Sequence, residues 1–515
     1  MKKSSEHDRN VLRPLPIGLL LALAAFVALF VSPPSLADEE EEGEKKCGKL
    51  KNLEYELHGT KTIYEDARRY IRKKDGDELP KPFDDDSLAE EDHDLRKGNK
   101  CRPVAFYFIG RHTARFPDAE DIEAYNKDLA GLVEELKTRP DCAQKRQEFL
   151  SWRSKMVAKH DNLITELGAR EERDIARRFR AIYPEFFDTK QANIEIGVTS
   201  KWRTAQTGAA FLREVANLSL GSECASLPTN DVDQPNYNLD QVLGASCYKK
   251  LIELYEKPYL EFHKQCEKLS GVSKIRDSRV DRVKDPEVVR PIAQRVASKL
   301  GLESAALSPK LLDSVYQMCK FENALQDRSV WCSLFEKRDV QALEYIEDVN
   351  SYFKSAYGPQ ANVNQSCPLV GHLLDAFHSV AREQNQTSGA GPRRAWFYFS
   401  HADPMKKLLA TFKMFRDDES FSEQKLDRFV EELKVPKRRH WRTSIITPFS
   451  ANLAFIMYRC QRDPSRPVKF KILATVTEQP VKLAGCKDTD CNSERFFSAY
   501  DNLRHCDLGR VCARA

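Results

Sequence analysis

The sequence predicts an α/β fold, with a three-layer α/β domain and an inserted all-helical lobe. Apolar runs of strand character at 104–109 and 395–400 each end directly in polar residues that include a histidine. Amphipathic helical patterns separate these runs, and from about 217 to 358 only helical patterns occur. Because a single core stops growing near about 250 to 300 residues, a chain of 515 residues is expected to form two structural units.

The chain is expected to consist of four parts. Residues 1–37 are expected to be a signal peptide and residues 38–100 a polar leader. The α/β domain is expected to comprise 101–216 and 359–515, with the helical lobe at 217–358. A lobe inserted in this way is expected to cover the carboxyl ends of the strands, where ligands of open α/β sheets bind.

The first 37 residues have the features of a targeting segment. Basic residues precede an apolar run at 17–31, which is short for a bilayer span of about 20 residues. Pro33 and Pro34, followed by small residues, predict cleavage before Asp38. The alternative is an uncleaved signal anchor. In either case we expect the body of the protein in the secretory-pathway lumen, such as that of the endoplasmic reticulum, or outside the cell.

The leader at 38–100 is rich in charged residues, and we expect it to be solvated rather than part of the core. Across the whole chain, 82 Lys and Arg residues face 78 Asp and Glu residues, for a formal net charge of +4. Such a balance gives no whole-molecule field that would attract nucleic acid. Any site for a polyanion must therefore be a local cluster.

Fourteen cysteines in a chain bound for an oxidising compartment predict disulfides rather than metal sites. The alternative is that most are free, buried thiols, and the sequence does not give the pairing. Asn217, Asn364 and Asn385 begin Asn-x-Ser/Thr triplets and are candidate glycosylation sites. Together these features predict a secreted glycoprotein.

The candidate chemistry begins where the run 104–109 stops at Gly110. Arg111, His112 and Arg115 follow at once, at the carboxyl end of a predicted strand. Two guanidinium groups there can bind phosphate oxygens, and an imidazole between them can attack phosphorus. Such residues on their own are also typical of an exposed surface loop.

The remaining elements follow in chain order. We expect a helix at 118–137, a strand at 194–198 that leads to Arg203, and helices through the lobe. The strand at 395–400 leads to His401 and Asp403, and it is followed by a helix at 404–412. Beyond these we expect a strand at 444–446, a helix at 451–460 and a strand at 468–476.

Segment 111–117, Arg-His-Thr-Ala-Arg-Phe-Pro, resembles the Arg-His-Gly-x-Arg-x-Pro signature of the histidine phosphatase superfamily, in the branch of acid phosphatases and phytases. The run His401-Ala402-Asp403 after a strand is similar to the His-Ala-Glu or His-Asp motif of that branch. Further segments resemble one family in particular, multiple inositol polyphosphate phosphatase: 199–203, 318–322, 331–335, 366–369 and 447–453.

The resemblance implies a role for each of six residues. His112 would be the nucleophile that forms a phosphohistidine, and Asp403 the general acid that protonates the leaving oxygen. The substrate phosphate would be bound by Arg111, Arg115, Arg203 and a protonated His401. No metal or cofactor is needed in this scheme. Metal ligation by the two histidines is the alternative, but the adjacent arginines would repel a cation.

Two positions depart from the family pattern. Thr113 stands where the signature has glycine, which places a side chain in a loop whose backbone approaches phosphate closely, so catalysis or specificity is expected to change. Asp403 stands where the inositol polyphosphate branch more often has glutamate, and we expect this change to be tolerated. Asp403 must be kept protonated either by its surroundings or by the charge of the arriving substrate.

We therefore expect a secreted phosphatase that hydrolyses inositol polyphosphates, from inositol hexakisphosphate to lower forms, with 2,3-bisphosphoglycerate as a further candidate substrate. The alternatives are a broad-specificity acid phosphatase and a catalytically impaired inositol polyphosphate-binding protein. The expected partner is a small-molecule polyphosphate, with no nucleic acid and, once the signal peptide is cleaved, no stable membrane partner. Positional specificity on the inositol ring and oligomeric state do not follow from the sequence.

Overall fold

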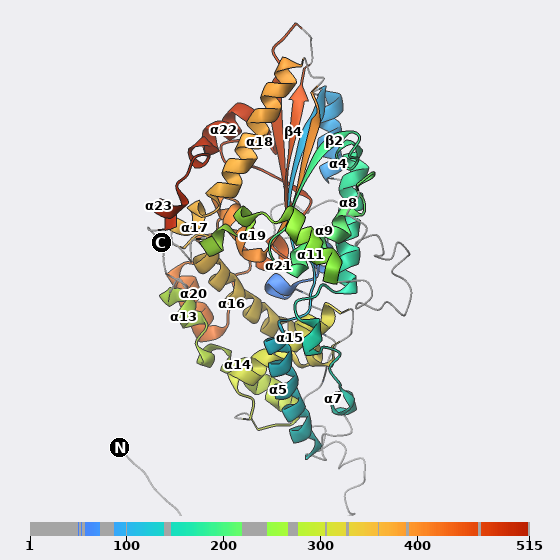
Figure 1. Ribbon diagram of the computed structural model, residues 1–515. Coiled ribbons are helices and arrows are strands. Elements are labelled where there is room, and N and C mark those ends of the chain that lie inside the picture. The colour runs from blue at the N-terminus through green and yellow to red at the C-terminus, as the bar shows by residue number, and fades with distance from the viewer. Residues whose placement is uncertain are drawn as a thin grey trace, which may run out of the picture.

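The computed structural model describes residues 50, 53, 57–72, 87–98, 100–138, 146–218, 245–265, 277–303, 306–325, 329–358, 360–387, 391–461 and 465–512. The predicted signal peptide, residues 1–37, lies outside these ranges. Within them, the chain forms one mixed β-sheet with many helices, so the predicted α/β class is confirmed. Figure 1 shows helices on both sides of the sheet and a group of helices at one end of it.

The sheet has the strand order β2-β3-β1-β4-β5-β6, with β7 paired to β5. Strands β2, β3 and β1 run parallel, whereas β4 is antiparallel to β1 and β5 is antiparallel to β4. The carboxyl ends of the three parallel strands therefore meet at one edge. The strands are β1 (Cys101–Arg111), β2 (Ala192–Gly197), β3 (Arg393–Ser400), β4 (Asn452–Cys460), β5 (Lys469–Val476), β6 (Gln479–Val481) and β7 (Asp490–Asn492).

The helices account for most of the remaining described chain. In order they are η2 (Gly59–Lys61), α3 (Tyr64–Arg72), α4 (Ser87–His93), η3 (Asp94–Gly98), α5 (Ala119–Lys137), α7 (Gln147–Ser151), η5 (Ala158–His160), α8 (Glu166–Ile182), η6 (Pro184–Phe186), α9 (Trp202–Leu212), α11 (Ala245–Tyr255), η8 (Pro258–Glu261), α13 (Ser278–Val283), α14 (Pro286–Leu300), α15 (Pro309–Asn323), η9 (Val330–Leu334), α16 (Lys337–Ser355), α17 (Gln360–Asn364), α18 (Cys367–Gln386), α19 (Ala402–Thr411), α20 (Glu423–Glu432), α21 (Thr443–Ile446), α22 (Ser493–Tyr500), η10 (Asp501–Leu503) and α23 (Leu508–Cys512).

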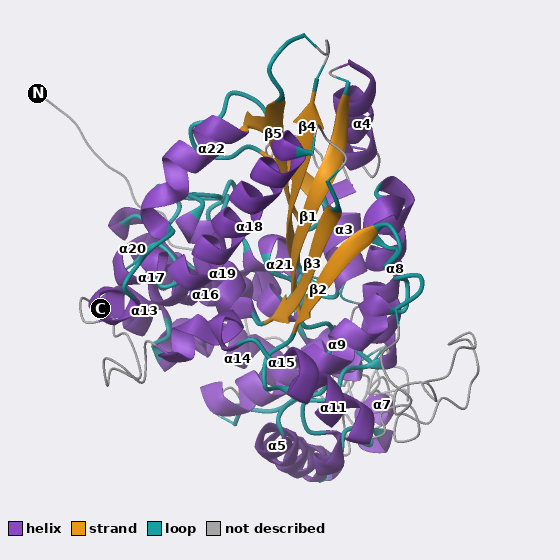
Figure 2. Cartoon of the chain, turned by 45° about the horizontal axis from the view of Figure 1, so that its top comes forward, coloured by secondary structure: helices purple, strands orange, loops and turns teal. Residues whose placement is uncertain are grey.

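Strand β1 is buried on both faces, because helices cover the sheet on either side (Figure 2). Since successive side chains of a strand point in opposite directions, Phe106 packs against Phe179 of α8, with ring centroids 5.4 Å apart. Tyr107 packs against Phe377 of α18 on the other face, at 6.4 Å. This alternation explains why 104–109 is a continuous apolar run.

The helices α5, α14, α15 and α16 lie at the end of the sheet toward which β1, β2 and β3 run (Figure 1). No strand occurs in the described residues 245–265, 277–303, 306–325 and 329–358. Helix α5, which precedes residue 217, packs with α15 at this same end. The boundaries 217 and 358 of the predicted lobe stay a prediction.

Two predicted elements are wrong. Residues 451–460, expected as a helix, form the central strand β4, whose residues are buried on both faces. A continuous apolar run does not distinguish a buried strand from a buried helix. Residues 444–446, expected as a strand, belong to the short helix α21, where Asp348 of α16 accepts hydrogen bonds from the Thr443 backbone N (2.8 Å) and Oγ1 (2.7 Å).

The leader was expected to be solvated, but its described part contributes to the core. Tyr64 has no exposed surface, and its hydroxyl donates to Glu478 at 2.7 Å and accepts from Asn452 Nδ2 at 3.0 Å. Glu478 in turn accepts from Arg178 at 2.7 Å. The charged composition of this segment is thus compatible with burial because its groups find partners far along the chain.

Disulfides were predicted, and four are confirmed between described residues: Cys101–Cys460, Cys319–Cys332, Cys367–Cys506 and Cys486–Cys491. The first joins the start of β1 to the end of β4, and Cys367–Cys506 joins the start of α18 to the C-terminal tail. Among the described residues, no helix has both the length and the apolar character needed to cross a bilayer.

Candidate active site

The ends of β1 and β3 bring the two predicted catalytic segments together. Arg111 and Ser400 are register partners in the parallel pair, and the backbone N of His112 donates to the Ser400 carbonyl at 2.9 Å. His112 and His401 therefore extend side by side beyond the sheet, with ring centroids 5.6 Å apart. Segments almost three hundred residues apart thus form one site at the edge where the three parallel strands end.

His112 is held in a form suited to nucleophilic attack. Its Nδ1 lies 3.0 Å from the carbonyl oxygen of Thr113, and because a carbonyl only accepts, Nδ1 carries the proton. The lone pair is then on Nε2. Burial, with the positive charges of Arg111 and Arg203, holds the pKa of His112 well below its usual range. The ring is consequently a neutral imidazole, as expected for a nucleophile.

Three arginines surround this imidazole. Arg111 donates to the carbonyls of Thr60 (2.6 Å) and Thr447 (2.8 Å), and its guanidinium lies 4.7 Å from the ring centre of Phe449. Arg115 donates to the Phe116 carbonyl at 2.7 Å, and Arg203 donates to Asn162 at 3.1 Å. In each of Arg111, Arg115 and Arg203 the buried Nε has no hydrogen-bond partner among the described residues.

Burial and mutual repulsion lower the pKa values of the arginines in this cluster. Burial lowers the pKa of Arg111 to about 9 and that of Arg203 to about 10, and Arg115 adds repulsion to both. Asp403 and Glu347 offset only part of this effect at Arg111. A site with this excess of positive charge is suited to a multiply charged anion.

His401 differs from the sequence-based expectation that it is protonated. Burial lowers its pKa to about 4, so in the free protein it is neutral at pH 7. Its Nε2 lies 3.0 Å from Thr199 Oγ1 and 3.4 Å from Glu261, while its buried Nδ1 has no partner among the described residues. Glu261 raises the pKa of His401 and is placed to stabilise an imidazolium once an anion arrives.

Asp403, the predicted general acid, lies in the first turn of α19, and its side chain is 52% exposed. Its Oδ1 lies 2.6 Å from Lys406 Nζ and accepts from Ser355 at 3.2 Å. The Lys406 ammonium holds the pKa of Asp403 well below its usual range. The surroundings therefore favour the ionised carboxylate, and of the two expected sources of protonation only the arriving substrate remains.

Comparison with known proteins identifies the family. The family model described as histidine phosphatase superfamily (branch 2) matches residues 107–472, which is more than half of the chain. The chain belongs to the histidine phosphatase superfamily. The prediction from segment 111–117 is thus confirmed, and the protein is a phosphatase.

Several relatives of this histidine phosphatase are similar over most of their length. Multiple inositol polyphosphate phosphatase 1 of Gallus gallus is 25% identical over 464 residues, covering 88% of this chain and 92% of the relative. The Homo sapiens protein of the same name is 25% identical over 469 residues, covering 89% and 88%.

Two solved structures share the fold. The phytase from D. castellii aligns with a TM-score of 0.54 at 12% identity and covers 94% of this chain and 91% of that one. The multiple inositol polyphosphate phosphatase of Bifidobacterium longum in complex with phosphate aligns with a TM-score of 0.52 at 13% identity, covering 88% and 99%.

Thr113, which departs from the signature of the histidine phosphatases, is fully buried and hydrogen-bonded to its surroundings. Its Oγ1 donates to the Gly168 carbonyl at 2.8 Å and accepts from Ser450 Oγ at 2.7 Å. Its backbone N donates to Thr207 Oγ1 at 3.1 Å. A Cβ on Gly168 would lie 2.7 Å from Thr113 Oγ1, so glycine there makes room for the threonine. The extra side chain therefore joins the catalytic loop to α8 and to Ser450, and the backbone of the same residue joins it to α9.

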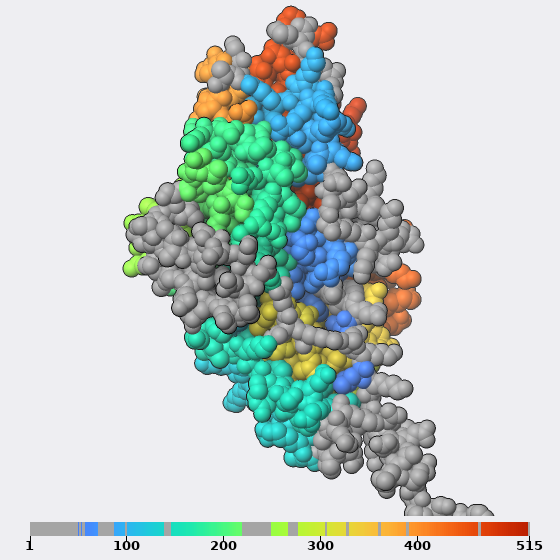
Figure 3. Space-filling view, turned by 90° about the vertical axis from the view of Figure 1, so that its right-hand side faces the viewer, coloured from blue at the N-terminus to red at the C-terminus, as the bar shows by residue number. Residues whose placement is uncertain are grey.

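Sequence reasoning missed several residues of this histidine phosphatase that lie beside the predicted ones. Lys61 comes from the leader, Glu261 from η8, and Lys406 from the turn after Asp403. The space-filling view of Figure 3 shows residues of the leader, in blue, reaching the surface between the green region of α8 and the yellow helical end. The motif similarity at 447–453 was a signal for Thr447 and Phe449, but it did not indicate what they contact.

The three candidate glycosylation sites lie in different settings. Asn217 and Asn385 are exposed, and Asn217 Nδ2 donates to Asp188 at 2.7 Å. Asn364 is half-buried, and Ser366 of its triplet is fully buried. The structure thus favours Asn217 and Asn385 over Asn364 as positions that a glycan could occupy.

Proposed function

We propose that this histidine phosphatase hydrolyses phosphomonoesters of inositol polyphosphates through a phosphohistidine on His112, and that it acts in the secretory pathway or outside the cell. The observation that carries the proposal is the neutral, oriented imidazole of His112 among Arg111, Arg115 and Arg203. The substrate class is supported by the relatives named multiple inositol polyphosphate phosphatase 1, which match most of this chain.

The first chemical step transfers the phosphoryl group to His112. Nε2 attacks phosphorus, the bond from phosphorus to the ester oxygen breaks, and the leaving oxygen takes a proton from Asp403. The arginines hold the charge that spreads over the three phosphoryl oxygens during this transfer. In the second step a water attacks the phosphorus of the phosphohistidine and gives a proton to Asp403. The bond from phosphorus to Nε2 breaks, inorganic phosphate leaves, and His112 is restored.

Protonation of Asp403 is tied to substrate binding in this scheme. In the free protein Lys406 keeps the carboxylate ionised. A polyanion that enters the site raises the pKa of Asp403 by repulsion and competes with it for Lys406. A substrate that arrives as a phosphate monoanion also brings a proton with it. The negative charge of the substrate also attracts an imidazolium and so favours protonation of His401, whose Nδ1 can then donate to the substrate.

The placement of Thr113 favours an enzyme over an impaired binding protein. Its hydroxyl is satisfied by Gly168 and Ser450, so it does not fill the space beside Nε2 of His112. Secretion is supported by the disulfide-bonded cysteines, because disulfides persist in oxidising compartments.

A phosphate-release assay with the purified full chain tests the function. We expect hydrolysis of inositol hexakisphosphate at a higher kcat/KM than hydrolysis of p-nitrophenyl phosphate, and we expect the His112→Ala variant to have lost both activities. Efficient hydrolysis of p-nitrophenyl phosphate without release from inositol hexakisphosphate would instead establish a broad acid phosphatase. Release from neither substrate would contradict the proposal.

A further inference from the structure

Lys61 lies beside the arginines of the site, although it comes from the leader. Its Nζ is 5.9 Å from the ring centre of Phe449 and 5.6 Å from that of Phe321. The same Phe449 ring faces Arg111 at 4.7 Å and lies 6.1 Å from the His112 ring. Lys61 and Arg111 therefore share one aromatic side chain next to the nucleophile.

The side-chain nitrogen of Lys61 has no carboxylate partner in the part of the chain that the structure describes. No ion pair joins it to any of the described residues, and two of the acids near it face other cations. Glu347 lies 2.8 Å from Lys320 Nζ, and Asp118 faces Arg115 at 3.9 Å. Burial holds the pKa of Lys61 well below its usual range, and the charges of Arg115 and Arg111 lower it further. The charged form of this lysine is therefore disfavoured in the free protein and gains from an anion that binds beside it.

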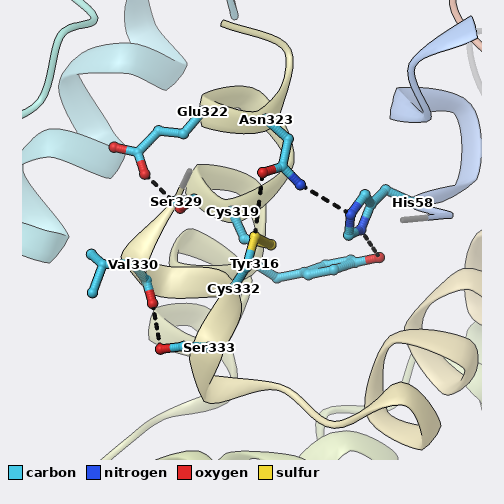
Figure 4. The surroundings of a disulfide bond; sticks show 9 residues. All are labelled: His58, Tyr316, Cys319, Glu322, Asn323, Ser329, Val330, Cys332 and Ser333. Carbon is cyan, nitrogen blue, oxygen red and sulfur yellow. Dashed lines mark hydrogen bonds between the residues drawn. A yellow bond between two sulfur atoms is a disulfide. The ribbon is translucent and has the colours of Figure 1, made fainter. Parts of the chain in front are cut away.

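The backbone around Lys61 is held in place on several sides. Thr60 accepts from Arg111 through its carbonyl at 2.6 Å, and Gly59 adopts φ +57° against Glu347, where a Cβ would collide with the carboxylate. His58 hydrogen-bonds Tyr316 and Asn323 of α15, next to the Cys319–Cys332 disulfide (Figure 4). The position of Lys61 is thus built by its neighbours and is not that of a free surface lysine.

We propose that Lys61 binds a second phosphate group of the substrate, next to the one that His112 attacks, and that it gives the site its preference for polyphosphorylated substrates. The proposal rests on the function proposed above. The attacked phosphate has three free oxygens, and in the proposed function Arg111, Arg115, Arg203 and His401 bind them. Lys61 lies beside this set through the Phe449 ring that it shares with Arg111, so its amino group is placed for a neighbouring phosphate.

The test compares Lys61→Met with the wild type on two substrates. On inositol hexakisphosphate we expect kcat/KM to fall by about 10- to 100-fold, mainly through a higher KM, because one charge-assisted contact is lost. On p-nitrophenyl phosphate, which carries a single phosphate, the loss should be at least ten times smaller. Lys61→Arg keeps the charge and should recover most of the difference.

Lys127, exposed on α5, provides a matched control. Lys127→Met should behave as the wild type on both substrates. An equal loss on both substrates in Lys61→Met would overturn the proposal, because the lysine would then act on the attacked phosphate or on the fold. An unchanged kcat/KM on inositol hexakisphosphate would overturn it as well. Failure of the wild type itself to hydrolyse inositol hexakisphosphate would contradict the proposed function instead.

Discussion

Replacing Thr113 by valine tests whether the unusual residue of the signature supports the catalytic loop. Valine keeps the shape of the side chain but removes the hydroxyl that joins Gly168 and Ser450. The Thr113 carbonyl also accepts the hydrogen bond that orients the His112 ring. Loosening of residue 113 therefore disturbs both the packing of the loop and the tautomer of the nucleophile.

The expected effect follows from the two hydrogen bonds. A buried polar group left without a partner costs about 1 to 3 kcal/mol, and a typical hydrogen bond contributes about 1 kcal/mol. We expect the free energy of unfolding to fall by about 2 kcal/mol. Because small displacements of a reacting group lower the rate steeply, we expect kcat on inositol hexakisphosphate to fall by about 10-fold.

The assay combines urea unfolding with steady-state kinetics. Thr113→Ser keeps the hydroxyl and should retain most stability and activity. Thr138→Val, which removes an exposed hydroxyl bonded to the Glu135 carbonyl, is the matched control and should change stability by less than about 0.5 kcal/mol. Thr113→Gly restores the family residue but loses both bonds, so its activity should fall rather than rise. A glycine or valine variant as stable and active as the wild type would refute this reasoning.

Two further predictions concern carboxyl groups. Asp403→Asn should slow phosphoenzyme formation on inositol hexakisphosphate by about 10²- to 10⁴-fold, as measured by rapid quench. The loss on p-nitrophenyl phosphate should be far smaller, because its leaving group needs no proton. Equal losses on the two substrates would assign Asp403 another role. Burial raises the pKa of Glu171 from 4.5 to about 8, so the folded state keeps a proton that the unfolded state has released, and stability is lost as pH rises from 4.5 toward 8. In Glu171→Gln the free energy of unfolding should fall less steeply with pH, by up to about 1.4 kcal/mol per pH unit. Urea unfolding midpoints measured between pH 5 and pH 8 test this, and the same pH dependence in variant and wild type would contradict the prediction.

The strand-to-loop transitions at 111 and 401 could be read from the sequence because both signals are local. An apolar run followed by Arg, His and Arg marks the end of a strand, and parallel strands end at a common edge. The role of His112 as the nucleophile also followed from the motif. The tautomer of its ring did not, because it depends on a backbone carbonyl whose place is set by the loop.

The remaining parts of the site depend on packing between distant segments. Lys61 and Glu261 lie in charged stretches with no motif. Contacts of η2 with α16 and α21, and of η8 with β3 and α18, place them near His112 and His401. The helix expected at 451–460 was wrong because burial on both faces of β4 removes the alternation that marks a strand. His401 was expected to be protonated, but its burial, which the sequence does not reveal, opposes the charged form.

The most direct test of the account is to trap the phosphorylated enzyme during turnover. The wild type is mixed with inositol hexakisphosphate, quenched within milliseconds in alkali, which preserves phosphohistidine, and mapped by peptide mass spectrometry. We expect phosphate on the peptide that contains His112, at Nε2, and none on the peptide that contains His401. Steady turnover with no phosphate on His112, or turnover by His112→Ala at the wild-type rate, would contradict it.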